Sequence, residues 1–168
     1  MQYNAAMDSL DLQVLSQARD WRAQGHAVWL VSVIETWGSA PRPPGALLAM
    51  RSDGLVVGSV SGGCVEDDLI DRVRHGERVA TPSLVTYGVT KDEAARFGLP
   101  CGGNLRLVQE PLGDTAWIDE VLARTARHEL VARTLDLKTG VVSVESATRG
   151  ETFTFDGSRL RALFGPRW

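Results

Sequence analysis

The fold class of this chain is decided by Ala46-Leu47-Leu48-Ala49-Met50-Arg51-Ser52-Asp53-Gly54-Leu55-Val56-Val57-Gly58-Ser59-Val60. Two apolar segments of strand length, 46–50 and 55–60, flank Ser52-Asp53-Gly54, which is a strong hairpin signal. The segment 63–75 that follows is the clearest helix, with apolar residues four apart, acidic residues in its first turn and basic residues in its last. Strands and helices are thus mixed without strict β-α-β alternation, which predicts an α+β fold.

Outward from this run, apolar periodicity and turn residues predict the remaining elements. A first helix is capped by Asp8 or Ser9 and runs to about residue 24, where Gly25 ends it. The other expected elements are strands at 27–34, 83–87 and 105–109, helices at 91–97 and 114–127, and an antiparallel meander at 130–137, 141–144 and 152–155. We therefore expect a mixed, largely antiparallel sheet packed with about three main helices.

Composition and charge narrow the functional class. The 168 residues are 43% hydrophobic and 23% charged, which is ordinary for one globular domain. A net charge of -3 argues against a nucleic-acid-binding protein, which usually has a basic excess. The sequence has no apolar run of membrane-spanning length and no signal peptide, so its two cysteines predict reduced thiols in the cytoplasm.

Cys64 follows a glycine pair in Gly58-Ser59-Val60-Ser61-Gly62-Gly63-Cys64-Val65-Glu66 and opens the predicted helix. Free backbone N–H groups at a helix start stabilise a thiolate and bind phosphate or carboxylate, and glycines let a ligand approach closely. The hydroxyls of Ser59 and Ser61 add donors. The acidic residues at 66–68 oppose an anion, so their side chains must point away if the site is to work. The alternative is a buried cysteine in a glycine turn.

Two further segments carry candidate site residues. Cys101, Gly102, Gly103 and Asn104 stand before a strand, where the glycines permit unusual backbone angles and the asparagine amide can recognise a ligand. The alternative there is a β-bulge. Arg42 lies in a proline-rich loop, 36–45, that holds its backbone, and a rigid guanidinium reads phosphate well. The alternative is a solvated arginine.

Three motifs together resemble the XdhC/CoxI family of accessory proteins for xanthine dehydrogenase, carbon monoxide dehydrogenase and related molybdenum hydroxylases. They are 36–45 (Thr-Trp-Gly-Ser-Ala-Pro-Arg-Pro-Pro-Gly), 58–66 as quoted above, and 97–104 (Phe-Gly-Leu-Pro-Cys-Gly-Gly-Asn). The resemblance implies a cytoplasmic maturation chaperone rather than a turnover enzyme. Such a protein binds molybdenum cofactor (molybdopterin) as cargo, presents it for sulfuration by a cysteine desulfurase and delivers it to the apo-enzyme. A homodimer is expected from the family.

The residues and the resemblance agree physically. A pterin phosphate suits a glycine-rich helix start, and a thiophilic molybdenum suits a cysteine, with Cys64 favoured over Cys101 as the contact. Trp37 offers a flat surface for a pterin ring, or is a core residue. Family members commonly continue into a Rossmann-like domain. We therefore expect residues 1–158 to form the N-terminal domain and residues 159–168 a linker toward a second domain absent from this chain.

Two other functions stay open from the residues alone. The chain is either a thiol-dependent sulfur-transfer or redox protein that uses Cys64 as nucleophile, or a docking module. The first lacks a histidine near either cysteine in the sequence, and a Cys64 pKa at or above about 8.5 would count against it. The second predicts that the chain captures a dehydrogenase or desulfurase.

Overall fold

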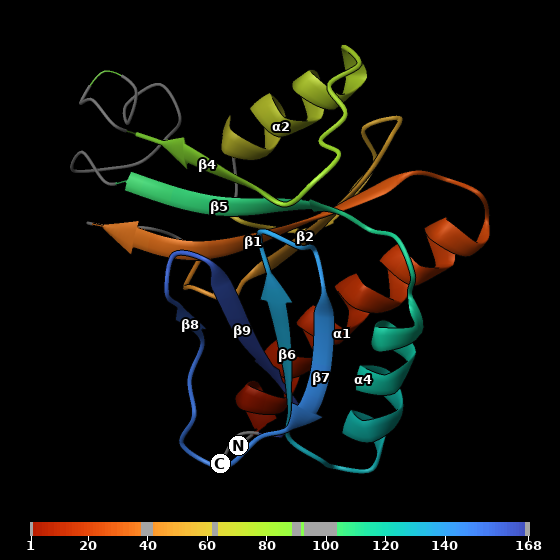
Figure 1. Cartoon of the computed structure of the whole chain (residues 1–168), viewed down its shortest axis with the longest axis vertical. Helices are drawn as coiled ribbons and strands as arrows, with labels where there is room; N and C mark the ends of the chain where they lie inside the picture. The colour runs from red at the N-terminus through yellow and green to blue at the C-terminus, as the bar shows by residue number, and fades with distance from the viewer. Residues whose placement is uncertain (1, 38–41, 62–63, 89–91, 93–103, 167–168) are drawn as a thin grey trace.

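A computed structural model of the chain describes residues 2–37, 42–61, 64–88, 92 and 104–166. Within these residues the chain forms three helices and two antiparallel sheets, so the α+β expectation is confirmed (Figure 1). The helices are α1 (Gln2–Ala23), α2 (Cys64–Arg74) and α4 (Ala116–Ala126). The strands are β1 (Val28–Trp37), β2 (Leu47–Arg51), β3 (Val56–Gly58), β4 (Ser83–Tyr87), β5 (Asn104–Pro111), β6 (Val131–Asp136), β7 (Val142–Ser146), β8 (Thr154–Phe155) and β9 (Arg159–Phe164).

The first sheet has five strands in the order β3-β2-β1-β5-β4, and every neighbouring pair is antiparallel. The predicted hairpin joins β2 to β3, and Gly54 in its turn has a φ of 92°, which glycine adopts without strain. Strand β1 continues to Trp37, three residues beyond the predicted strand, because it keeps pairing with β5 past a bulge between Val33 and Glu35.

The second sheet differs from the predicted meander. Its order is β7-β6-β9-β8, so β8 pairs with β9 and has no ladder with β7. Residues 159–164 were expected to be a linker, which is wrong: they form β9, an internal strand paired on both sides. The reason is packing, since Leu160 and Phe164 are buried in the core.

Two hydrophobic clusters lie on opposite faces of the first sheet. Alternate residues of β1 divide between them, with Val31 and Val33 on one side and Leu30 on the other. Helix α2 covers the first side with Val65 and Leu69. Helices α1 and α4 and the second sheet cover the other (Figure 1).

Helix bounds differ from expectation mainly at α1. It begins at Gln2, so the predicted cap at Asp8 or Ser9 is wrong. The residues that precede Asp8 include alanine and methionine, which are good helix formers, and they belong to the helix. In α4 the fully buried residues are Ile118, which was not predicted, and Val121, while Trp117 and Leu122 are half-buried. The helix predicted at 91–97 lies outside the described residues, apart from residue 92.

Candidate functional site

The described residues of the three sequence motifs belong to segments that meet at one edge of the first sheet. Because all neighbouring strands are antiparallel, β1, β3 and β4 end at the edge where β2 and β5 begin. Trp37, the last residue of β1, pairs with Asn104, the first residue of β5. Figure 1 shows β1 and β4 ending on the side where β5 starts. We call this the motif edge; it carries the end of β1, the start of β2, the β3–α2 connection and the start of β5.

The β3–α2 connection places its donor groups around Glu66, a buried residue in the first turn of α2. One carboxylate oxygen, Oε2, accepts from Ser59 Oγ at 3.0 Å, Val60 N at 3.3 Å and Ser61 N at 3.2 Å. The other oxygen, Oε1, accepts from Ser61 Oγ. The requirement that Glu66 point away from this connection is therefore not met. In this arrangement the hydroxyl hydrogens of Ser59 and Ser61 bind a protein carboxylate.

Two other predicted site residues hold polar atoms that lack partners. Within the described part of the chain, the buried side-chain atoms without a hydrogen-bond partner are Arg22 Nε, Arg42 Nε, Asn104 Oδ1 and Arg133 Nε. Of these residues, Asn104 begins β5 at the motif edge, and Arg42 lies in the loop that joins the end of β1 to the start of β2. A buried polar atom without a partner costs free energy, which a ligand can recover. Arg42 offers a donor and Asn104 an acceptor, so the edge and its adjoining loop carry both kinds of group.

A cross-strand ion pair at the same edge was not predicted. Arg106 Nη1 lies 3.3 Å from Glu35 Oε2, and the two residues oppose each other on β5 and β1. Arg106 is two residues from Asn104 on β5, so both side chains lie on the same face of the sheet. Sequence alone carries no signal for this pair, because the opposition depends on the register after the β1 bulge.

Tyr87, the last residue of β4, connects that strand to α2 through a hydrogen bond. Its hydroxyl donates to Asp68 Oδ2 at 2.7 Å, and Arg72 Nε reaches the same oxygen at 2.9 Å. The Arg72 guanidinium carbon is 5.8 Å from the Tyr87 ring centroid. Burial and the hydrogen bond to Asp68 raise the pKa of the Tyr87 hydroxyl well above its ordinary value of about 10.

The raised pKa of Tyr87 predicts a loss of stability in alkali. The neutral phenol is favoured in the folded state, so its contribution is complete below about pH 10 and declines as the pH rises from there toward the folded-state pKa. Tyr87→Phe should therefore reduce the fall in unfolding free energy between about pH 9 and about pH 11. Urea unfolding at each pH measures how the unfolding free energy of the wild type and of Tyr87→Phe falls as the pH rises. An equal fall in both proteins would contradict the assignment.

Several predicted site residues cannot be placed. Gly62, Gly63, Cys101, Gly102 and Gly103 lie outside the described residues, so their roles stay predictions. Cys64 is the first residue of α2, as the sequence predicted for a helix start. Within the described residues, no group of three or more His, Cys, Asp or Glu is placed to hold a metal ion.

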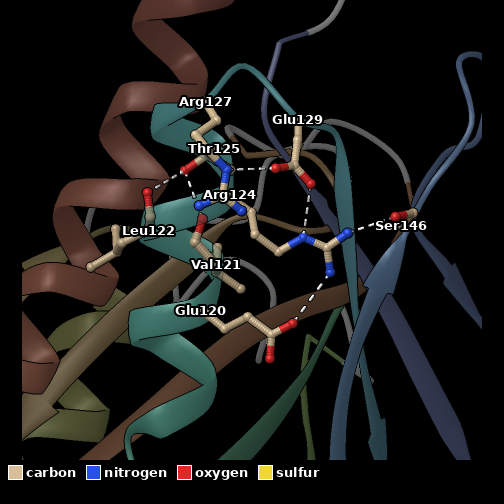
Figure 2. Close-up of polar contacts among 8 residues, drawn as sticks. All are labelled: Glu120, Val121, Leu122, Arg124, Thr125, Arg127, Glu129 and Ser146. Carbon is tan, nitrogen blue, oxygen red and sulfur yellow. Dashed lines mark hydrogen bonds and ion pairs between the residues drawn. The ribbon is translucent and has the colours of Figure 1, made fainter.

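A cluster of charged residues joins the end of α4 to the second sheet (Figure 2). Arg124 of α4 donates to Glu120 at 3.2 Å, to Glu129 at 3.1 Å and to Ser146 of β7 at 2.6 Å. Glu129 also accepts from Arg127 at 2.9 Å. These contacts fix the end of α4 to the second sheet and satisfy the charges internally, so we do not assign a ligand there.

No helix of the described chain is long and apolar enough to cross a bilayer.

Comparison with known proteins agrees with the sequence motifs. Residues 21–88 match the model of the XdhC and CoxI family, and this segment contains the first two of the three motifs. The resemblance predicted from the sequence is thus confirmed.

Two curated relatives and one solved structure are similar to the chain. The molybdenum cofactor insertion chaperone PaoD of Escherichia coli is 32% identical over 67% of this chain and 35% of its own length. A probable subunit of xanthine dehydrogenase from Bacillus subtilis is 31% identical over 45% of this chain and 23% of its own length. The chain thus spans about a third or less of either relative. The crystal structure of a xanthine dehydrogenase from Bacillus halodurans superposes with a TM-score of 0.64 over 90% of this chain and 52% of that one. At 18% identity this likeness shows the fold alone.

Proposed function

We propose that this chain, whose residues 21–88 match the XdhC and CoxI family, binds molybdenum cofactor as cargo during maturation of a molybdenum hydroxylase. A relative named as a molybdenum cofactor insertion chaperone supports this role. In the finer proposal the chain is not a turnover enzyme. It holds the cofactor for sulfuration by a cysteine desulfurase and passes it to an apo-enzyme of the xanthine dehydrogenase or carbon monoxide dehydrogenase type. Action in the cytoplasm and as a homodimer belongs to the same proposal.

The observation that carries the proposal is that two residues of the sequence motifs, one in the β1–β2 loop and one at the start of β5, each hold a buried atom without a partner among the described residues. Arg42 Nε donates and Asn104 Oδ1 accepts, and neither has a partner among the described residues. A pterin with a phosphate supplies both complements, since the phosphate and ring carbonyl accept hydrogen bonds and the ring N–H groups donate them. A soft thiolate from Cys64 or Cys101 is the proposed contact to molybdenum.

Glu66 sets an order among the proposed contacts. Ser59 and Ser61 can donate to a cofactor phosphate only if Glu66 leaves their hydroxyls, since both now bind its carboxylate. The Arg42 and Asn104 atoms need no such exchange. We therefore assign the first recognition of the cofactor to Arg42 and Asn104, with the β3–α2 connection following.

The test is retention of cofactor by the purified chain. Molybdenum cofactor mixed with the protein should co-elute in gel filtration, with pterin fluorescence and molybdenum in the protein peak. Asn104→Leu should lower retention while leaving the unfolding free energy of the free protein unchanged or higher, because it removes a buried acceptor that has no protein partner among the described residues. Arg42→Gln and Cys64→Ala should also lower retention.

A matched control separates the site from general charge effects. Arg159→Gln makes the same change of charge as Arg42→Gln on β9, where the arginine side chain is 65% exposed. It should retain cofactor as the unmodified chain does. Absence of co-eluting pterin, both from this chain and from a longer form that contains it, would refute the proposal. Equal retention by Asn104→Leu would remove Asn104 from the site.

A further inference from the structure

A second candidate site lies at the edge of the first sheet opposite the motif edge, where β5 ends and β4 begins. A cleft of about 520 Å³ opens there between the segment 80–82, the end of β5, the first turn of α4 and the β6–β7 hairpin. Pockets for small ligands commonly measure about 300–1,000 Å³. No residue of the predicted site lines this cleft, so it is independent of the proposed function.

The cleft wall is mixed in character, with apolar side chains beside charged ones, and it contains one positioned aromatic ring. Leu135, Val142 and Val144 line it together with Trp117 of α4. The guanidinium carbon of Arg133 lies 4.2 Å from the Trp117 ring centroid, and Arg133 is itself fixed by Glu110. The indole is therefore held in place before any ligand arrives. A fixed aromatic surface beside apolar side chains favours a flat ring system.

The charged groups of the wall select against anions. Glu110, Asp114 and Glu120 contribute three carboxylates, and the basic residue among the lining side chains is Lys138. Each carboxylate already accepts one or more hydrogen bonds, from Arg133, Ala116 N and Arg124 respectively. Carboxylate oxygens have further lone pairs, so they can accept from a ligand but cannot donate to it. The complementary ligand is rich in N–H donors.

We infer that this cleft binds a flat, uncharged nitrogen heterocycle that bears amino groups, the chemistry shared by purine bases and pterins. The ring contacts Trp117 and the apolar wall, and the amino and ring N–H groups donate to the carboxylates. Stacking of a base on an aromatic side chain is worth about 1–3 kcal/mol by alanine substitution and tolerates different bases.

Calorimetric titration of the whole chain with guanosine, adenosine, neopterin and uridine tests the inference and distinguishes the sources. At least one of the three amino-bearing compounds should bind, and uridine, which lacks an amino group, should bind about tenfold more weakly or less. Ala116→Tyr should weaken binding about tenfold by filling the cleft from an exposed position of α4. Ala126→Tyr is the control, because Ala126 is also exposed on the same helix but does not line the cleft.

Three results would overturn the inference: no binding by any amino-bearing compound, binding of uridine as tight as theirs, or unchanged binding by Ala116→Tyr. Asn104→Leu should bind guanosine and adenosine normally, since Asn104 lies at the motif edge. If Asn104→Leu abolishes binding instead, the compounds occupy the motif edge and the cleft assignment is wrong. Failure of the proposed function would leave the normal binding to the cleft unaffected.

Discussion

Replacing Arg133 by leucine is expected to lower the unfolding free energy by about 3–5 kcal/mol, because it leaves the Glu110 carboxylate buried without its partner. Both residues are nearly inaccessible, with side chains 2% and 4% exposed. Arg133 Nη1 donates to Glu110 Oε2 at 2.9 Å, and Nη2 donates to Oε1. The pair joins β6 of the second sheet to β5 of the first, so its loss affects the junction between the sheets.

The pair itself is expected to add little net stability. Burying two charges costs about as much as their attraction returns, and Arg133 Nε remains without a hydrogen bond among the described residues. The double variant Glu110→Leu with Arg133→Leu should therefore recover most of the stability that either single variant loses. The residues near the ion pair favour this recovery of stability, because Leu135 and Trp117 already present apolar surface to the position of the two leucines.

Urea unfolding of the wild type, both single variants and the double variant gives a double-mutant cycle. A large positive coupling is expected between positions 110 and 133. Arg159→Leu, which removes an exposed arginine 3.7 Å from Asp136, should change stability little and serves as the control. Additive losses in the cycle would contradict a tightly coupled buried pair.

Local patterns predicted the elements whose signals lie within a few residues. The strand at 83–87 and the hairpin around Gly54 were predicted from alternation and turn residues, and both are observed. Strand β9 was missed although Arg159, Leu160, Arg161 and Ala162 alternate polar with apolar. Its partner β6 is distant in the sequence, and the local pairing with β8 across residues 156–158 was missed because the end of the chain was interpreted as a linker.

The site was predictable in composition but not in arrangement. Sequence motifs identified Arg42 and Asn104, and the antiparallel strand order brings their segments to one edge. The condition that Glu66 point away from the β3–α2 connection is not met, and an acidic residue at the third position of a helix often reaches back to the residues before it. The Glu35–Arg106 and Tyr87–Asp68 contacts depend on register and on helix placement, which local patterns do not contain.

Gly58→Ala is the second large expected effect, and it links stability to the motif edge. Gly58 has a φ of 87°, which costs about 1–2 kcal/mol for an L side chain. A Cβ atom there would lie 2.3 Å from the carbonyl oxygen of Leu47 and 2.8 Å from Val14 Cγ2. Because the first contact is backbone, strand β2 or β3 must move, so the total loss should exceed about 3 kcal/mol.

Gly76→Ala is the matched control for Gly58→Ala. Gly76 has a similar φ of 92°, but nothing lies within 4 Å of its added Cβ, so only the backbone cost of about 1–2 kcal/mol should appear. The difference between the two variants in urea unfolding measures the close approach at Gly58. Equal losses of unfolding free energy in the two variants would show that β2 and β3 accommodate the added Cβ atom at no cost in stability.

The same substitution should disturb the β3–α2 connection. The Leu47 oxygen that the new Cβ would strike also accepts from Ser59 N at 3.1 Å, and Ser59 begins the group of donors around Glu66. Moving that carbonyl shifts Ser59 and the residues that lead to Cys64. Gly58→Ala should therefore lose cofactor retention under conditions where it is still folded, whereas Gly76→Ala, which follows the other end of α2, should keep it. Retention by both variants would mean that cofactor binding does not depend on the geometry of this connection.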